Sequence, residues 1–508
     1  MTTPTRKTGV MRASVHLSAA TLMVTLANLG RDVAIAAVYG TSLTADAFYL
    51  ALAVPVFLAT VAIGSFRNAV VPVLEKVEQA HGATVLRNVV GGFFLGNSLV
   101  TVSVGALVAL TAPLYVRFLG ARLPVGGVHL LTYISWAVLP MMLLSVLAAL
   151  NDGPLHVRGR FFVPTLSRVT LPFGIASGAL LLQGEFGIYG ACIGGAVGAS
   201  IQLCLSGFLL KMEDLLGTCT MTDSLRVRAE VKSQFFMLAA GTSIVYVSPI
   251  INQWMASFLG TGAVATLGYA NRLAVGVSSL TTGALAPALL LHFSRQVSKR
   301  DVASLNDSYV IFLKIAIWTG CALAIFVNAI SYPAVELLYE RGQFCQSDTI
   351  AVAGVLSFYA LQFPPLLVSA AAFTLISALG KNKIFIPLSA ANAIINVAGN
   401  AVFMKLFGIN GIAISTALTY CVSLLAMNVV LARGGFIRIP RDVLLHGLSA
   451  VVVAIVIVAV CHLVVASQRL DSGCIAGAYY IAGLAVFCVL ASVAIRAELK
   501  SLLRPYRS

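Results

Sequence analysis

Charged residues are scarce in this sequence. Of its 508 residues, only 10% are Asp, Glu, Lys or Arg, whereas 59% are hydrophobic. Soluble globular proteins carry roughly a quarter of their residues as charged side chains, so a mean hydropathy of +0.95 excludes that class. The composition predicts an integral membrane protein.

Paired cysteines and clustered histidines are also lacking. The nine cysteines occur singly, mostly within apolar runs and without a CxxC pair, and the seven histidines are isolated from one another. Zinc sites and disulfide frameworks need such residues at short, regular spacings. We therefore expect no metal site, no disulfide framework and no cofactor.

Two further absences restrict the function. No GxxxxGK[ST] phosphate loop is present, so the chain is not expected to pump with ATP, and the longest external connector, 332–349, offers too few acids or bases for an enzyme. The formal charge of +15 would suit nucleic acid, but the basic residues form neither a patch nor a tail. We expect a non-enzymatic protein without a nucleic-acid partner.

Long apolar runs fill most of the sequence. A spanning helix needs about 20 mostly apolar residues, and this length gives about fourteen candidate spans. A basic start resembles a signal peptide, but the apolar run continues past residue 30, so we expect a retained first helix. The candidates are 14–39, 46–72, 85–111, 128–150, 161–183, 187–210, 234–259, 264–293, 308–331, 350–379, 384–405, 409–432, 444–466 and 474–496.

The placement of basic residues gives the orientation. With both termini in the cytoplasm, most of the 33 Lys and Arg residues fall in cytoplasmic segments, as the positive-inside rule requires. Arg67, Arg168 and Lys314 lie within spans but near their cytoplasmic ends, where a long side chain can extend to the headgroups. The net positive charge is then mainly a topology signal.

Three sequence pairs recur in the same order at a nearly constant offset. YGTSLTADAFY (39–49) matches LGTGAVATLGY (259–269), FVP (162–164) matches FIP (385–387), and FGIYGACI (186–193) matches FGINGIAI (407–414). Such self-similarity indicates a duplication, here of six helices that enter the membrane from the same side. The predicted fold is an all-α polytopic membrane protein with an N-terminal lobe (1–210), a cytoplasmic linker (211–232), a C-terminal lobe (233–432) and two extra helices with a tail (433–508).

Two arginines lie deep in predicted spans. Arg31 is on the first helix and Arg272 is on the eighth, at similar depths in opposite lobes. Facing each other across a cavity, their guanidinium groups would suit a phosphate or pyrophosphate. The alternative is structural neutralisation, of Arg31 by Asp32 or Asp46 and of Arg272 by backbone carbonyls. Adjacent helical residues point about 100° apart, so we do not expect an ideal pair between Arg31 and Asp32.

A stripe of asparagines marks the eleventh span. Asn392, Asn396 and Asn400 recur every four residues on one helix face, and Asn252 and Thr416 are predicted to approach it. A site for a coupling ion would use these oxygens, although hard cations prefer carboxylates. Hydrogen bonding between helices is the simpler interpretation.

Several motifs together resemble a known family. The runs GRDVAIAAVYG and TADAFYLA (30–51), YANRLAVGVSSLTTGALAPALLLHFS (269–294) and LYERGQF (338–344) are similar to the MurJ branch of lipid-linked oligosaccharide flippases, in the superfamily that also holds multidrug antiporters. The resemblance covers helices 1–12. It implies a two-lobed transporter that moves undecaprenyl-pyrophosphate-linked glycans from the inner to the outer leaflet of the bacterial cytoplasmic membrane, with the last two helices lining a groove for the lipid tail.

The resemblance also implies site residues. Arg31, Asp46 and Arg272 match charged positions of the family's central cavity, and Arg67 is expected at the cytoplasmic entrance. This chain departs from the family at Thr25, where an arginine is expected. A further arginine and a glutamate are missing from the second span, which has Ala59, Thr60 and Ile63 in that neighbourhood.

These departures predict a less cationic cavity, so two cargoes stay open: lipid II and a lipid-linked repeat unit of an exopolysaccharide or O-antigen. The expected partners are the lipid-linked glycan, membrane lipids and enzymes that assemble peptidoglycan or polysaccharide. The alternative function is a cation-coupled multidrug antiporter on the same scaffold.

Overall fold

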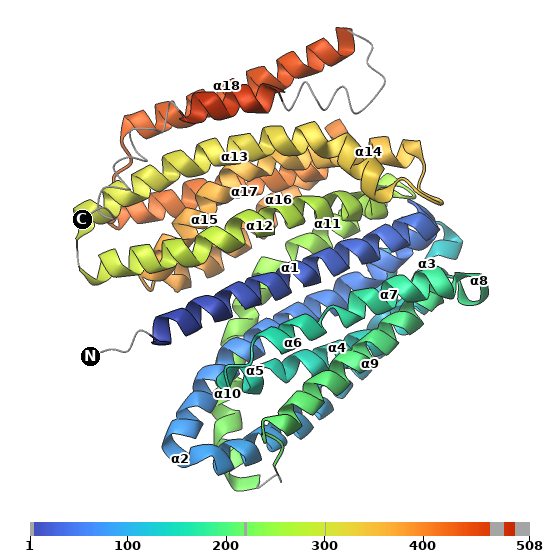
Figure 1. The fold of residues 1–508 in the computed structure, drawn as a ribbon. Coiled ribbons are helices and arrows are strands. Elements are labelled where there is room, and N and C mark those ends of the chain that lie inside the picture. The colour runs from blue at the N-terminus through green and yellow to red at the C-terminus, as the bar shows by residue number, and fades with distance from the viewer. Residues whose placement is uncertain (1–4, 218–220, 300, 468–481, 493–508) are drawn as a thin grey trace. The chain divides into compact units, whose positions relative to one another are not determined.

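The computed structural model describes residues 5–217, 221–299, 301–467 and 482–492. It divides into two compact units: unit 1 comprises residues 1–265 and 341–344, and unit 2 comprises residues 266–340 and 345–508 (Figure 1). No strand occurs in the described ranges, which confirms the predicted all-α fold.

Unit 1 is built from eleven helices and the start of a twelfth. They are α1 (Thr5–Tyr39), α2 (Leu43–Leu119), α3 (Val125–Ala137), α4 (Leu139–Leu150), α5 (Asp152–Val157), α6 (Phe162–Ser167), α7 (Thr170–Leu181), α8 (Gln183–Phe186), α9 (Ile188–Met212), α10 (Met221–Tyr246) and α11 (Ser248–Ala256), with a short 3-10 turn at Ser257–Leu259.

Unit 2 takes most of α12 and the helices that follow it. They are α12 (Ala263–Ser298), α13 (Val302–Tyr339), α14 (Gln346–Tyr359), α15 (Phe363–Ala378), α16 (Phe385–Phe407), α17 (Asn410–Arg433) and α18 (Arg441–Ser467), with 3-10 turns at Ala360–Gln362 and Asn382–Ile384.

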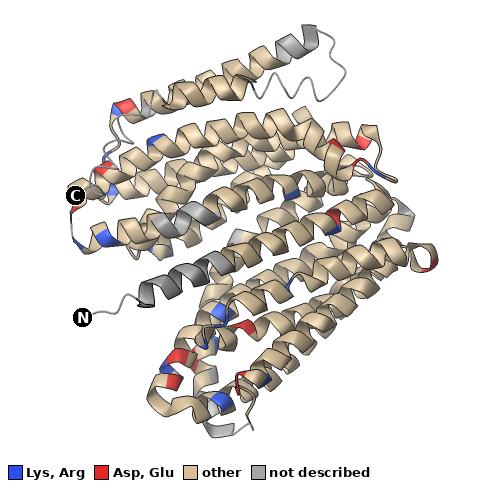
Figure 2. Ribbon diagram, in the orientation of Figure 1, with Lys and Arg blue, Asp and Glu red and all other residues tan. Residues whose placement is uncertain are grey.

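Many of these helices suit a bilayer by length and composition. In the described ranges, nine helices are long and apolar enough to cross a membrane, or ten if the bent pair α10 and α11 forms one span. Figure 2 shows most of the helical ribbon without charge. The molecule is therefore a multi-pass membrane protein.

The number of spans stays a prediction. Helix α2 is interrupted at Gly82, whose φ of 79° leaves the helical region, so this one element contains the two predicted spans 46–72 and 85–111. The predicted span 161–183 is divided into α6 and α7. Part of the last predicted span, 474–496, lies outside the described residues.

The boundary between the units differs from the predicted lobe boundary. The seventh predicted span, which forms α10 and α11, belongs to unit 1. Helix α10 packs against α2, where Ser65 Oγ lies 3.4 Å from Thr242 Oγ1, and Val231 joins the core cluster that contains Phe66. The sequence pattern contains no such contacts; it placed residues 211–232 in the linker and the span 234–259 in the second lobe. The predicted lobes stay a prediction.

The backbone supports the internal repeat. Positive φ angles recur at a constant offset of 221 residues, at 159 and 380, at 187 and 408, and at 214 and 435. Gly187 (φ 53°, ψ −134°) and Gly408 (φ 57°, ψ −135°) have nearly the same conformation at the start of α9 and α17. Duplication of one helical unit is expected to place positive φ angles at matching positions of both copies, as these three pairs show.

Candidate functional site

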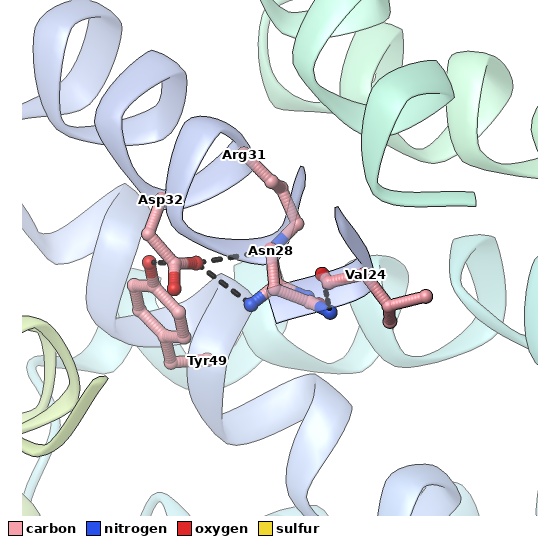
Figure 3. Close-up of polar contacts among 5 residues, drawn as sticks. All are labelled: Val24, Asn28, Arg31, Asp32 and Tyr49. Carbon is pink, nitrogen blue, oxygen red and sulfur yellow. Dashed lines mark hydrogen bonds and ion pairs between the residues drawn. The ribbon is translucent and has the colours of Figure 1, made fainter. Parts of the chain in front are cut away.

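A polar cluster interrupts the apolar surface of α1 in unit 1. Arg31 and Asp32 lie three and four residues after Asn28, so each of them lies on the same side of the helix as Asn28 (Figure 3). Asn28 Nδ2 donates to the backbone carbonyl of Val24 at 2.8 Å. This hydrogen bond holds the Asn28 side chain against the preceding turn of α1.

Arg31 and Asp32 form an ion pair, which is the structural neutralisation that the sequence left open as the alternative. Arg31 Nε and Nη2 donate to the same oxygen, Asp32 Oδ1, at 2.9 and 2.7 Å, and only 12% of the Arg31 side chain is exposed. The arginine side chain is long enough to turn back towards its neighbour, although both bonds go to one oxygen instead of forming a fork-to-fork pair. The 100° separation on the helix weakened the ideal geometry but did not prevent the pair.

Tyr49 on α2 completes this arrangement. Its hydroxyl donates to Asp32 Oδ1 at 3.1 Å, and both residues are buried (Figure 3). Three hydrogen bonds to one carboxylate oxygen hold Asp32, which in turn orients the guanidinium group of Arg31. The sequence reasoning missed Tyr49; the available signal was a tyrosine at the end of the TADAFY motif, within an apolar run.

The oriented arginine keeps capacity for an anion. A guanidinium group carries five N–H donors. Two of them bond to Asp32, and no other acceptor for Arg31 is found among the described residues. The remaining donors suit a phosphate oxygen, whereas Asp32 offsets the cost of keeping the cation among apolar helices.

Asp46 has a structural role in unit 1. It is fully buried, and its two oxygens accept the backbone N–H groups of Gly262 at 2.5 Å and Ala265 at 2.8 Å. These groups open α12, and Asp46 itself lies in the first turn of α2, so one carboxylate is placed at two positive helix ends. The predicted contact between Asp46 and a headgroup stays a prediction, and both oxygens are already occupied.

The RGQF motif belongs to the same corner of unit 1. The N–H of Gln343 donates to the carbonyl of Ala37 on α1 at 2.8 Å. Gly342 has a φ of 63°, and a Cβ there would overlap the Ala37 oxygen, so only glycine fits. The segment Arg341–Phe344 thereby joins unit 1 although the chain on both sides belongs to unit 2.

Arg67 lies in a second charged cluster, near α5. Asp152 is buried and pairs with Arg168, and Arg67 acts electrostatically on both Asp152 and His156. Arg168 was predicted to extend to the headgroups; the structure pairs it with a carboxylate. Lys314 in unit 2 behaves likewise, since its Nζ lies 3.0 Å from Asp442 Oδ2. Contact between Arg67 and a substrate at the cytoplasmic entrance stays a prediction.

Arg272 is on α12 in unit 2 and is half-buried. Less than one turn before it, Tyr269 packs against Tyr339 of α13, with ring centroids 5.1 Å apart and both rings fully buried. This contact holds the part of α12 that carries Arg272. The approach of Arg272 to Arg31, which lies in the other unit, stays a prediction.

The asparagine stripe lies at the contact between α16 and α17. Asn396 and Asn400 are buried, Asn392 Nδ2 donates to Ser423 Oγ at 2.7 Å, and the Asn396 carbonyl accepts from Ser415 Oγ at 3.1 Å. These bonds support the interpretation as contacts between helices. Thr416 Oγ1 donates to Ile412 of its own helix, and Asn252 lies on α11 in unit 1. A coupling-ion site at these residues stays a prediction.

Side chains that could ligate a metal ion do not gather in the described part of the chain. Within the described ranges, no group of three or more His, Cys, Asp or Glu residues could hold a metal ion. The cysteines described are all free thiols.

The fold and the site define a class: an all-helical, multi-pass membrane protein with an oriented arginine inside a membrane helix. A family model described as "Lipid II flippase MurJ" matches residues 35–476. The chain belongs to the MurJ family.

Two relatives give the extent of the similarity. The chain is 26% identical over 362 residues to the "Probable lipid II flippase MurJ" of Aquifex aeolicus, covering 70% of each chain. It is 26% identical over 445 residues to the "Lipid II flippase MurJ" of Burkholderia cenocepacia, covering 84% of each. The similarity therefore extends well beyond the motifs.

Solved structures share the fold. "Lipid II flippase MurJ, inward closed conformation" superposes with a TM-score of 0.77 at 20% identity, covering 96% of this chain and all of the other. An inward-facing multidrug resistance transporter of the MATE family superposes with a TM-score of 0.69 at 15% identity, covering 83% and 98%. At these identities the likeness concerns the fold alone.

Proposed function

We propose that this protein is a flippase that carries an undecaprenyl-pyrophosphate-linked glycan from the inner to the outer leaflet of the bacterial cytoplasmic membrane. The observation that carries the proposal is Arg31, a largely buried guanidinium group on a membrane helix, oriented by Asp32 and Tyr49 and with donors left for an anion. Membership of the MurJ family supports it. The protein performs no covalent chemistry in this proposal.

The proposed mechanism is alternating access of two lobes around a midplane site. Arg31 binds the pyrophosphate together with Arg272, and Arg67 meets it at the cytoplasmic side. A diphosphate diester carries about two negative charges, and an inside-negative potential favours its export by about 2.3 kcal/mol per charge per 100 mV. Energy for transport is then available from the membrane potential.

Lipid II and an exopolysaccharide repeat unit are the two candidate cargoes. The relatives named above are lipid II flippases or probable lipid II flippases, which favours lipid II. Thr25 and the second-span residues Ala59, Thr60 and Ile63 leave the neighbourhood of Arg31 with fewer cations than the family pattern has, which favours a different headgroup. The assembly enzymes that act on the cargo are the expected partners.

The rival function, cation-coupled drug export, has weaker support. It requires a membrane-embedded acid that can exchange protons or sodium. In unit 1 the buried acids are engaged: Asp32 with Arg31, Asp152 with Arg168, and Asp46 with two backbone N–H groups. Protonation during ion exchange would break these existing ion pairs and hydrogen bonds, and a buried partner left unpaired is costly.

The test combines genetics with transport. The wild-type gene is expected to rescue cells depleted of their lipid II flippase if the cargo is lipid II, and purified protein in liposomes should translocate a fluorescent lipid II. Arg31→Ala should abolish both, whereas Arg117→Ala, at an exposed arginine near the end of α2, should leave both intact. Failure of rescue together with transport of a lipid-linked polysaccharide unit would assign the other cargo. Transport of neither, or full activity of Arg31→Ala, would overturn the proposal.

A further inference from the structure

Unit 1 contains an apolar cavity that shares only Ala59 with the residues named in the flippase proposal. Its volume is about 550 Å³, and its walls come from both arms of α2, from α4 and from the middle of α10. Only three of the residues that line it are polar: Asn97, Thr101 and Lys232. A space of this size lined by carbon binds hydrocarbon, because water would find few partners there.

The cavity is elongated along the helices. It extends from Pro55 to Phe66 on the first arm of α2 and from Phe93 to Val108 on the second. At 1.5 Å per residue these stretches are roughly 16 and 22 Å long. A long, narrow, apolar space fits a single hydrocarbon chain better than a compact ligand.

The two ends of the cavity differ in charge. Phe66, Phe93, Leu150 and Val231 belong to one packed cluster at one end, and the exposed Lys232 follows Val231 directly. At the other end the lining is Pro55, Val108 and Leu139. In the described part of the chain no carboxylate forms an ion pair with Lys232. Its ammonium group is therefore available to an anion at the mouth of an apolar channel.

We propose that this cavity holds one acyl chain of an anionic phospholipid, with the lipid phosphate at Lys232. The segment RVRAEVK (226–232) is basic, and the asymmetry of Lys and Arg assigns this end to the cytoplasmic leaflet, whose anionic lipids attract such segments. The chain fills the space between α10 and the two arms of α2. The lipid thereby stabilises the packing of α10 on unit 1, independently of the transported cargo.

The test uses the full-length protein in liposomes that contain phosphatidylglycerol with a photoreactive group in one acyl chain. After illumination, labelled peptides are identified by mass spectrometry. We expect labelling to concentrate on 55–66, 93–108, 139–150 and 231–236. Replacing the probe by the zwitterionic phosphatidylcholine with the same chains should lower labelling about fivefold, the effect of one basic residue near the surface.

Two variants and their matched controls decide the result. Ala62→Trp fills the cavity and should remove labelling of its walls, whereas Ala106→Trp, at an exposed position of the same helix outside the cavity, should not. Lys232→Gln should make labelling by phosphatidylglycerol and by phosphatidylcholine equal. Lys211→Gln, at an exposed position on α9, should keep the stronger labelling by phosphatidylglycerol. Size-exclusion profiles and thermal unfolding establish whether each variant is folded. If Ala62→Trp is not folded, Lys232→Gln still tests the lipid contact.

Contrary outcomes are equally defined. Labelling spread evenly over membrane-facing helices, unaffected by Ala62→Trp, would overturn the assignment. If a photoreactive polyprenyl phosphate at equal concentration labels the same segments more strongly, the phospholipid assignment is wrong and the occupant is the carrier chain. Since the readout is labelling and not transport, failure here leaves the flippase proposal standing.

Discussion

Asp32 is the residue on which the arginine site depends. One of its oxygens accepts from Arg31 twice and from Tyr49 once, within a buried setting. A cation and an anion held this way keep the helix neutral while leaving donors on the guanidinium group. Asp32 thus orients the side chain of Arg31, and Tyr49 holds the side chain of Asp32.

Tyr49→Phe tests this order of support. The change removes one hydrogen bond to a carboxylate and should cost about 1.5 to 3 kcal/mol of folding free energy, with weaker binding of a lipid-linked pyrophosphate. Thermal unfolding and binding of a fluorescent substrate give the two readouts. Tyr39→Phe is the control, because the Tyr39 hydroxyl is buried with no hydrogen-bond partner among the described residues, and its loss should be neutral or slightly stabilising. Equal effects of the two variants would contradict the proposed support of Asp32.

At the scale of elements, the start of α12 depends on a residue more than two hundred positions earlier. Asp46 caps Gly262 and Ala265, and Gly262 itself lies against the Thr41 carbonyl, where a Cβ would come within 2.5 Å. The chain passes from unit 1 to unit 2 directly after this cap, at residues 265 and 266. The cap therefore anchors one crossing of the chain to unit 1.

Asp46→Ala should loosen this anchor. Loss of a helix cap costs about 2 kcal/mol at the upper end of the measured range, which would raise amide exchange at Gly262 and Ala265 about thirtyfold by local opening. Hydrogen–deuterium exchange with mass spectrometry measures it. Asp348→Ala removes another acceptor of a backbone N–H, that of Cys345, and should leave exchange at 262–265 unchanged. Normal protection at 262–265 in Asp46→Ala would show that the cap is dispensable.

The repeated glycines make an independent prediction. Gly187 and Gly408 have positive φ and ψ near −135°, with open space where a Cβ would lie, so only backbone strain opposes substitution. Gly187→Ala and Gly408→Ala should each cost about 1 to 3 kcal/mol in thermal unfolding. Gly184→Ala in α8, which lacks a positive φ and also has open space, should be neutral or stabilising. A cost at only one member of the pair would mean that the two copies no longer share this strain.

At the scale of the whole molecule, the proposed anion site needs both units. Arg31 belongs to unit 1 and Arg272 to unit 2, and each is held by its own neighbours: Arg31 by Asp32, and its counterpart by the packing of Tyr269 on Tyr339. A shared pyrophosphate would couple the two arginines energetically. Two separate structural arginines would act independently.

A double-mutant cycle distinguishes these cases. The binding free energies of a lipid-linked pyrophosphate to Arg31→Ala, Arg272→Ala and the double variant should show a coupling of at least about 0.5 kcal/mol, the lower limit for residues that share a partner. Arg31→Ala combined with Arg433→Ala, at an exposed position ending α17, should be additive. Additivity in the first cycle would place the arginines at separate sites.

Much of this protein could be predicted from its sequence because the signals are local. Scarce charge and long apolar runs specify membrane helices, since each span must pair its own backbone N–H and C=O groups in hydrogen bonds. The repeat follows from matching residues at a nearly constant offset, whereas the depth of Arg31, counted along one helix, stays a prediction.

Tertiary structure alone decided the partners of the charged and special residues. The pairing of Arg31 with Asp32, the cap from Asp46 to α12, the docking of Gly342 on Ala37 and the place of α10 in unit 1 depend on side-chain reach or on contacts between distant segments. Composition and helical spacing determine where a side chain starts and which face it shares. The partner of a side chain is determined by how far the side chain reaches and by which helices pack together. Arg31, which marks a site in the sequence, therefore acquires its orientation only in the folded protein.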